Sequence, residues 1–102
     1  MVVGTPGGTT IPTSVFQSIV NVIDFNMNAD DAVNKPKFHH QWLPDEVTIE
    51  KGFNTETKNA LLKMGYKLKD VSAIGRTELI LLKNGKKETA ADSRGDDSVA
   101  GF

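Results

Sequence analysis

The chain of 102 residues contains no cysteine, so disulfide frameworks and thiol chemistry are excluded, while oxidising and reducing compartments both stay open. It has no apolar run near the roughly 20 residues that a membrane-spanning helix needs. It also lacks an excess of one charge, because 12 basic and 13 acidic residues give a net charge of −1. A surface for nucleic acids or anionic membranes is therefore not expected.

The residues that are present can form one modest core. Hydrophobic residues make up 38 % of the chain, which suits a single small domain. Apolar residues recur at helical spacing from Ile11 to about Asp24, and this predicts the clearest helix, with Thr10 as its N-cap and Pro12 in its first turn. Because Phe16 and Val20 widen the apolar stripe, we expect this helix to be buried on more than one side.

Shorter elements are predicted in the remainder of the chain. Asn28 is expected to cap a helix over residues 29–34, and Asn54 or Thr55 to cap another that ends at Gly65. Strands are predicted over residues 1–3, 46–51, 66–71, 77–83 and 87–91. The continuous apolar run Leu79–Leu82 predicts a strand covered on both faces, and Asn84-Gly85 predicts a type I′ hairpin turn. This order of elements predicts an α+β fold, with a mostly antiparallel sheet and helices packed on its faces.

The stretch Gly4–Thr10, with the sequence Gly-Thr-Pro-Gly-Gly-Thr-Thr, is the main candidate for chemistry. It joins a predicted strand to a helix N-terminus, and Gly7 and Gly8 permit positive φ and place no Cβ in the way of a ligand. The backbone N–H groups of such a turn, together with the positive end of the helix dipole, suit an anion or a developing oxyanion. The spacing matches neither a Walker A loop nor a dinucleotide fingerprint, and a plain tight connection is the alternative.

Other polar groups give weaker signals. His39 and His40 are adjacent, so their side chains diverge and do not form two ligands of one metal; a packed, hydrogen-bonded histidine is expected instead. A metal site at these histidines is therefore not expected. The tripeptide Arg94-Gly95-Asp96 is typical of integrin-type adhesion when it lies on an exposed loop, whereas Asp92 and Arg94 can equally form a local ion pair.

Four separated segments, in this order, closely resemble the C-terminal part of the γ-glutamyltransferases, also known as γ-glutamyltranspeptidases or glutathione hydrolases. The segments are Gly4–Gly8, Phe38–Glu46, Glu50–Phe53, and the tail from Asp92-Ser93-Arg94 to Ala100-Gly101-Phe102. The resemblance implies an N-terminal-nucleophile (Ntn) hydrolase with an αββα sandwich, made as a precursor that cleaves itself into a large and a small subunit. In that family the new N-terminal threonine of the small subunit attacks a γ-glutamyl amide, such as that of glutathione, and the acyl group passes to water or to an amino acid or peptide.

The same resemblance implies that Gly7 and Gly8 are the catalytic site residues of this chain, with their backbone N–H groups forming the oxyanion hole. Family members need no metal or organic cofactor. Their nucleophile and glutamyl-binding groups lie upstream of the matching part, so residues 1–102 are expected to form a single partial domain of the small subunit that is inactive alone. The expected partners are the large subunit and the upstream part of the small subunit. Family members are commonly exported.

Two further expectations concern the chain on its own. An unpaired sheet edge and bare apolar faces predict self-association or partial disorder. The alternative function is a non-catalytic module that holds a small anion at the Gly4–Thr10 turn. That module would be monomeric, would melt cooperatively and would bind phosphate or carboxylate. Adhesion through Arg94-Gly95-Asp96 is a third, weaker alternative.

Overall fold

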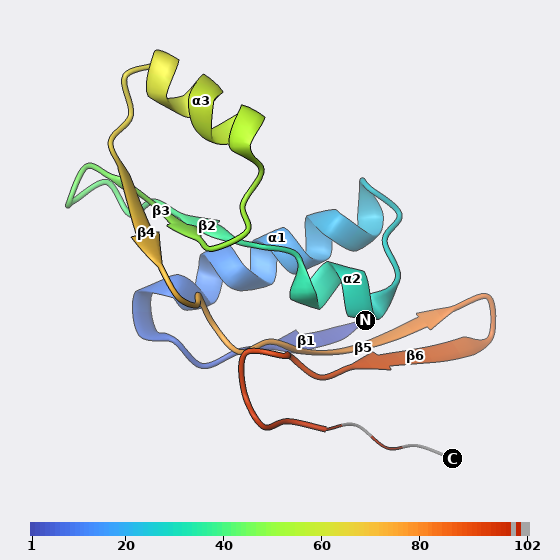
Figure 1. Cartoon of the computed structure of the whole chain (residues 1–102). Helices are drawn as coiled ribbons and strands as arrows, with labels where there is room; N and C mark the ends of the chain where they lie inside the picture. The colour runs from blue at the N-terminus through green and yellow to red at the C-terminus, as the bar shows by residue number, and fades with distance from the viewer. Residues whose placement is uncertain (99, 101–102) are drawn as a thin grey trace. The chain divides into compact units, whose positions relative to one another are not determined.

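The computed structural model describes residues 1–98 and 100 of the chain. These residues form two compact units (Figure 1). The first unit combines residues 1–35 with residues 75–102, and the second unit comprises residues 36–74. Each unit has its own three-stranded sheet. No helix built by the described residues is long and apolar enough to cross a bilayer.

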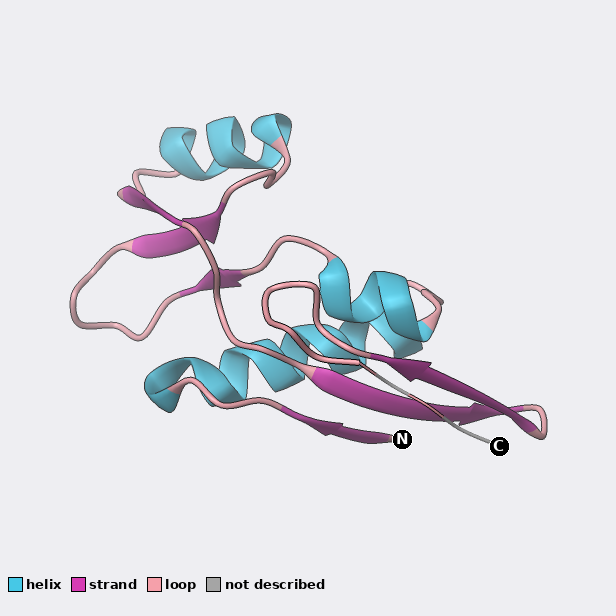
Figure 2. Cartoon of the chain, turned by 60° about the horizontal axis from the view of Figure 1, so that its bottom comes forward, coloured by secondary structure: helices cyan, strands magenta, loops and turns pink. Residues whose placement is uncertain are grey.

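The first unit is an antiparallel sheet with two helices on one face, as Figures 1 and 2 show. Its strands are β1 (Val2–Gly4), β5 (Glu78–Lys83) and β6 (Lys86–Ala90), in the order β1-β5-β6. Its helices are α1 (Ile11–Ile23), preceded by the short 3₁₀ helix η1 (Gly8–Thr10), and α2 (Ala29–Asn34). In the register of the sheet, Val3 lies opposite Leu79 and Leu79 opposite Ala90, and all three belong to or pack against the core.

Several local predictions for the first unit are confirmed. Asn84 and Gly85 have φ values of 53° and 75°, as a type I′ turn requires, and they join β5 to β6. The Asn28 side chain accepts a hydrogen bond of 2.8 Å from the Asp31 N–H, so Asn28 is the N-cap of α2. Thr10 precedes α1 as predicted, but its hydroxyl does not cap the helix.

The prediction that β5 is covered on both faces is wrong for this structure. Leu79 and Leu81 are buried beneath the helices, whereas Ile80 and Leu82 on the opposite face are 43 % and 66 % exposed. A strand turns alternate side chains to opposite faces, so the layer of α1 and α2 covers only every second residue of the apolar run. The apolar run therefore shows that both faces of the strand carry apolar side chains, but it does not show which other elements cover each face.

The burial predicted for α1 is also wrong. The side chains buried along this helix are Ser14, Ser18 and Val22, spaced by one turn, while Phe16 is 62 % exposed. Small serine side chains allow a close approach between α1 and the neighbouring backbone. The apolar periodicity located the helix correctly, but it overstated how much of the helix surface is buried.

The second unit contains a mixed sheet in the order β2-β3-β4. Strands β2 (Phe38–His39) and β3 (Val47–Glu50) are antiparallel, and β3 and β4 (Leu68–Val71) are parallel. The crossover between the parallel strands is α3 (Thr55–Lys63), as expected because parallel neighbours need a long connection. Asn54 caps α3 through the Thr57 N–H at 3.1 Å, which confirms the predicted start of this helix.

A buried carboxylate joins the two ends of the second unit. One oxygen of Glu50 accepts the Lys37 N–H at 2.6 Å, and the other accepts the Ile74 N–H at 2.9 Å. Glu50 is 4 % exposed, so burial of its carboxylate is balanced by hydrogen bonds to the backbone. The sequence did not reveal this role, because both partners are backbone groups far from Glu50 along the chain.

Candidate functional site

The stretch Gly4–Thr10, called the glycine turn below, begins where β1 ends and leads directly into η1 and α1. Gly7 has φ of 140° and Gly8 has φ of 60°, which confirms the predicted positive φ angles. Both residues are exposed. A Cβ atom at Gly7 would lie 2.5 Å from the Thr10 hydroxyl oxygen, so a side chain there would force Thr10 to move, whereas a Cβ at Gly8 would meet none of the described residues within 4 Å.

Hydrogen bonds to two carbonyl groups hold the peptide planes of this turn. The Thr5 hydroxyl donates to the Pro6 carbonyl at 2.7 Å. The Gly7 carbonyl accepts two bonds from Thr10, one from its N–H at 3.1 Å and one from its hydroxyl at 2.8 Å. A carbonyl and the N–H of the next residue share one rigid peptide plane and point in opposite directions. Holding the carbonyls of Pro6 and Gly7 therefore fixes the directions of the Gly7 and Gly8 N–H groups.

The two N–H groups themselves are available. Within residues 1–98 and 100, no hydrogen bond from either Gly7 or Gly8 N–H to another residue is formed. Buried backbone donors are almost always paired, but these two are at the surface, where a ligand can reach them. The turn thus offers two adjacent, oriented donors to a negatively charged or polarised oxygen.

A charged cluster lies beside the turn. Pro6, Arg76, Glu78 and Asp97 line a hollow of about 300 Å³. The Arg76 guanidinium binds Asp97 through two bonds of 2.6 Å. The hydrogen bonds from Arg76 and Glu78 lower the pKa of the Asp97 carboxyl, and burial followed by the hydrogen bond to Asp97 raises the pKa of Glu78. Asp97 is therefore the carboxylate of this pair that carries the charge most readily.

The predicted ion pair between Asp92 and Arg94 is confirmed and is not at the surface. The two side chains are 2.9 Å apart, with exposed fractions of 0 % for Asp92 and 10 % for Arg94. Asp92 also accepts the Thr77 N–H at 2.6 Å, and the Arg94 guanidinium donates to the Val33 and Lys35 carbonyls at 3.0 and 2.9 Å. Because the guanidinium is held against the protein, it does not project as an adhesion motif requires.

The two histidines have separate partners. His39 is buried, and its Nε2 lies 2.9 Å from the Gln41 side-chain oxygen, which confirms the predicted packed histidine. His40 places Nε2 3.1 Å from Asp45, and its Nδ1 accepts the Trp42 N–H at 3.2 Å. Among the described residues, no group of three His, Cys, Asp or Glu side chains is arranged to hold a metal ion.

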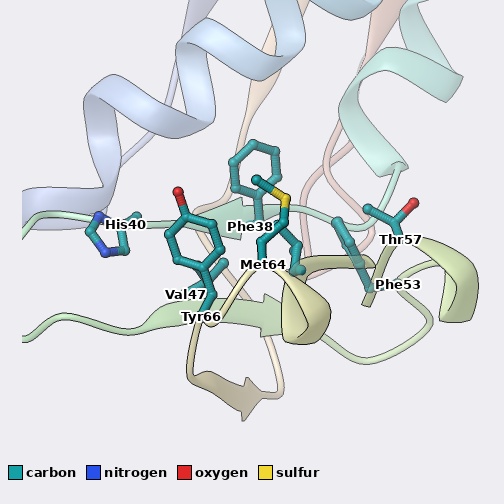
Figure 3. Close-up of a pocket in the computed structure, with 8 residues that line it drawn as sticks. Phe38, His40, Val47, Phe53, Thr57, Met64 and Tyr66 are labelled. Atoms are coloured by element: carbon teal, nitrogen blue, oxygen red, sulfur yellow. The ribbon is translucent and has the colours of Figure 1, made fainter. Parts of the chain in front are cut away.

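The second unit contains an apolar cavity that was not predicted (Figure 3). Its volume is about 360 Å³. It is lined by Phe38, His40, Val47, Phe53, Thr57, Leu61, Met64 and Tyr66. The Phe38 and Phe53 rings meet edge to face, with centroids 6.1 Å apart. The lining offers few polar groups that could orient a reacting substrate, so the glycine turn remains the better candidate for chemistry.

Comparison with known proteins decides the family. The sequence model of the gamma-glutamyltranspeptidase family matches residues 1–102. The chain belongs to the γ-glutamyltranspeptidase family. It is 44 % identical over 104 residues to the glutathione hydrolase proenzyme of Escherichia coli K12, covering 100 % of this chain and 18 % of that protein. It is 35 % identical to scoloptoxin SSD20 of Scolopendra dehaani, covering 100 % of this chain and 53 % of the toxin.

Solved structures agree with this assignment. A γ-glutamyltranspeptidase of Pseudomonas nitroreducens complexed with L-DON superimposes with a TM-score of 0.90 at 35 % identity, covering 99 % of this chain and 54 % of that one. A mutant γ-glutamyltranspeptidase of Helicobacter pylori gives a TM-score of 0.84 at 44 % identity, covering 92 % and 53 %. The chain therefore spans about half of these solved chains and a smaller part of the E. coli proenzyme.

The comparisons confirm the predicted family and fold. The γ-glutamyltranspeptidases, or glutathione hydrolases, are a family of Ntn-hydrolase enzymes, and the chain has their α+β fold with mostly antiparallel sheets. A cephalosporin acylase of Bacillus halodurans, 26 % identical, shares the fold with a TM-score of 0.88. The roles of Gly7 and Gly8 stay a prediction and are taken up below.

Proposed function

We propose that this chain supplies the oxyanion-stabilising donors of a γ-glutamyl-transferring enzyme, namely the backbone N–H groups of Gly7 and Gly8. The observation that carries the proposal is that both peptide planes are held through their carbonyls while both N–H groups are exposed and unoccupied by other described residues. Donors fixed in advance stabilise a developing negative charge without reorganisation during the reaction.

In the proposed reaction, the hydroxyl oxygen of an N-terminal threonine adds to the γ-carbonyl carbon of the substrate. The carbonyl electron pair moves onto oxygen, and the Gly7 and Gly8 N–H groups bind that oxyanion. Collapse of the intermediate breaks the amide bond, and the amine leaves with the proton from the threonine hydroxyl. Water or an amine then takes the acyl group. Glutathione and related γ-glutamyl compounds are the proposed substrates.

The remaining machinery is proposed to come from outside residues 1–102. The chain covers 18 % of the E. coli proenzyme, which leaves room for the nucleophile, the glutamyl-binding groups and a large subunit. We propose that residues 1–102 form one partial domain of a small subunit, and that this chain alone does not hydrolyse a γ-glutamyl anilide. Export of the whole protein and self-association of the isolated chain remain predictions.

The C-terminal segment, here residues 92–98, is also proposed to contribute to the reaction. One solved relative, 44 % identical with a TM-score of 0.84, is an acivicin-inhibited γ-glutamyltranspeptidase whose C-terminus has critical roles in autoprocessing and catalysis. In this chain, Asp92, Arg94 and Asp97 hold residues 92–98 against the rest of the first unit, through hydrogen bonds to Thr77 and Val33 and an ion pair with Arg76. These bonds support an equivalent role here.

A chimera tests the oxyanion role. Residues 1–102 replace the matching segment of the E. coli proenzyme, and turnover of γ-glutamyl-p-nitroanilide is measured. Replacing Gly8 by glycolate converts its N–H into an ester oxygen and is expected to lower kcat by about 10²–10³-fold, as for the loss of one oxyanion donor. The same exchange at Gly85, in the hairpin turn, is the control and is expected to leave kcat unchanged.

The chimera also distinguishes the oxyanion role from the alternative function, a non-catalytic anion-binding module. The anion-binding module would use the same two N–H groups, so phosphate binding by the isolated, monomeric chain would support it only if the chimera also proved inactive. An active chimera that keeps its kcat after the Gly8 exchange would contradict the oxyanion role itself.

A further inference from the structure

Arg76 contacts both the glycine turn and the C-terminal segment, and it uses different atoms for each. Its backbone N–H donates to the Thr5 hydroxyl oxygen at 2.7 Å. Its guanidinium forms the two 2.6 Å bonds to Asp97 described above. A fork of this kind fixes the plane and direction of the guanidinium as well as its distance from the carboxylate.

The Thr5 hydroxyl extends this connection into the turn. It accepts from Arg76 and donates its own proton to the Pro6 carbonyl at 2.7 Å, so its donor and one acceptor position are both used. The Pro6 carbonyl shares a peptide plane with the Gly7 N–H. Movement of the Arg76 backbone would therefore be transmitted through Thr5 to the direction of the Gly7 N–H.

Two glycines lie close to Arg76 and to its partner Thr5. A Cβ atom on Gly95 would clash with the Arg76 Nε, so the backbone at Gly95 packs directly on the guanidinium. On the other side, a Cβ on Gly75 would lie 3.0 Å from the Thr5 hydroxyl oxygen. Two glycines thus allow the segments around Arg76 to approach closely, and Pro6 borders the same hollow as Arg76 and Asp97.

We propose that Arg76 is a positioning residue, which sets the direction of the Gly7 N–H by linking Thr5 to Asp97 of the C-terminal segment. The Gly8 N–H has a separate support, because among the described residues the donors to the Gly7 carbonyl both belong to Thr10. The proposal rests on the proposed function for its catalytic meaning, but the link itself is a property of the folded chain. It predicts that changes at Asp97 affect one donor of the turn and spare the other.

The test measures the mobility of each N–H by ¹⁵N relaxation in the full 102-residue chain. In the unaltered chain both glycines are expected to have order parameters near 0.85, the value of rigid backbone. Asp97→Asn, Arg76→Gln and Thr5→Val are each expected to lower the order parameter of Gly7 towards about 0.6, and to leave that of Gly8 unchanged. Arg76→Lys keeps the charge but lacks the two-bond fork, so its Gly7 order parameter is expected to lie between those of the unaltered chain and of Arg76→Gln. Lys83→Gln, at the far end of β5, is the control.

Two comparisons make the outcome decisive. Adding Asp97→Asn to Thr5→Val is expected to change Gly7 no further, because both act through the same hydroxyl. Unchanged Gly7 order in Asp97→Asn and Arg76→Lys, or an equal change at Gly8, would overturn the proposal. In the chimera, the same variants are expected to lower kcat at constant KM. If Gly7 loosens while kcat stays constant, the positioning role stands and the proposed oxyanion function fails.

Discussion

Gly75 and Ser14 touch where the chain enters β5: a Cβ atom on Gly75 would lie 2.8 Å from the Ser14 hydroxyl oxygen. Ser14 is fully buried, and its hydroxyl finds no hydrogen-bond partner among the described residues. A small side chain on α1 and no side chain on Gly75 thus let the helix approach the loop that precedes β5. This contact gives a steric reason for a small side chain at Ser14 on the buried side of α1.

Gly75→Ala is therefore expected to destabilise the chain more than Gly85→Ala. Both glycines have nearly the same φ, 72° and 75°, so the left-handed backbone costs each alanine about 1–2 kcal/mol. Only Gly75 adds a steric clash, because a Cβ on Gly85 meets nothing within 4 Å. Urea unfolding of the two variants measures the difference, and equal losses would show that the contact with Ser14 relaxes freely.

The one-sided burial of β5 makes a second prediction. Leu79→Ala is expected to lower the free energy of unfolding by about 2–5 kcal/mol, the usual range for a leucine removed from a packed core. Leu82→Ala on the same strand is expected to cost less than about 0.5 kcal/mol, because Leu82 is already largely exposed. A comparable loss at Leu82 would mean that this face is covered in solution, for instance by a second copy of the chain.

Removal of the Asp92 side chain is expected to lower the free energy of unfolding strongly. Asp92→Ala leaves the buried Arg94 guanidinium and the Thr77 N–H without their shared acceptor, and breaking a buried pair of this kind costs about 3–5 kcal/mol. The matched control is Asp70→Ala, which removes an ion pair to Lys58 of 3.6 Å in which Asp70 is 79 % exposed. That change is expected to cost less than about 1 kcal/mol. Equal losses in thermal or urea unfolding would contradict the structural role of Asp92.

Glu78 is expected to make stability depend on pH. Its raised pKa means that the folded chain holds this proton more tightly than the unfolded chain does. The stability it contributes is therefore complete below the ordinary glutamate pKa and is lost as the pH rises through the raised value. Asp97 acts in the opposite sense, since its lowered pKa contributes stability that is lost as the pH falls below the ordinary aspartate range.

Glu78→Gln imitates the protonated side chain, so it is expected to raise stability at neutral pH and to flatten the decline above the ordinary glutamate pKa. Urea unfolding from about pH 4 to pH 8 covers the relevant range. Glu56→Gln, on the exposed first turn of α3, is the control and is expected to leave the profile unchanged. A profile for Glu78→Gln that parallels the unaltered chain would contradict the assignment.

Local signals predicted much of this fold from the sequence. The caps at Asn28 and Asn54 and the turn at Asn84-Gly85 depend on residues a few positions apart, and all three are confirmed. β2 was not predicted, because a strand of two residues has no measurable period. The buried sides of α1 and β5 were misjudged because burial depends on what other elements cover, which an apolar run does not record.

At the candidate site, too, local features were predicted from the sequence and long-range contacts were not. The identity and the positive φ of Gly7 and Gly8 could be read from the turn, because glycine is the residue that tolerates these angles. The support of the turn could not be predicted, since the Thr5 hydroxyl and the Arg76 N–H are separated by 71 positions in the sequence. Contacts of that range follow only from the completed sheet.

The bridge made by Glu50 bears on the order in which the chain folds. The pairing of β1 with β5 must bring Val3 to Leu79, so it closes a loop that contains the whole second unit. By binding the backbone near both ends of that unit, at Lys37 and Ile74, Glu50 shortens the effective loop once the second unit is formed. Shorter loops lose less entropy on closure and closer contacts form faster. We therefore expect residues 36–74 to condense first and to speed the assembly of the sheet that carries the glycine turn.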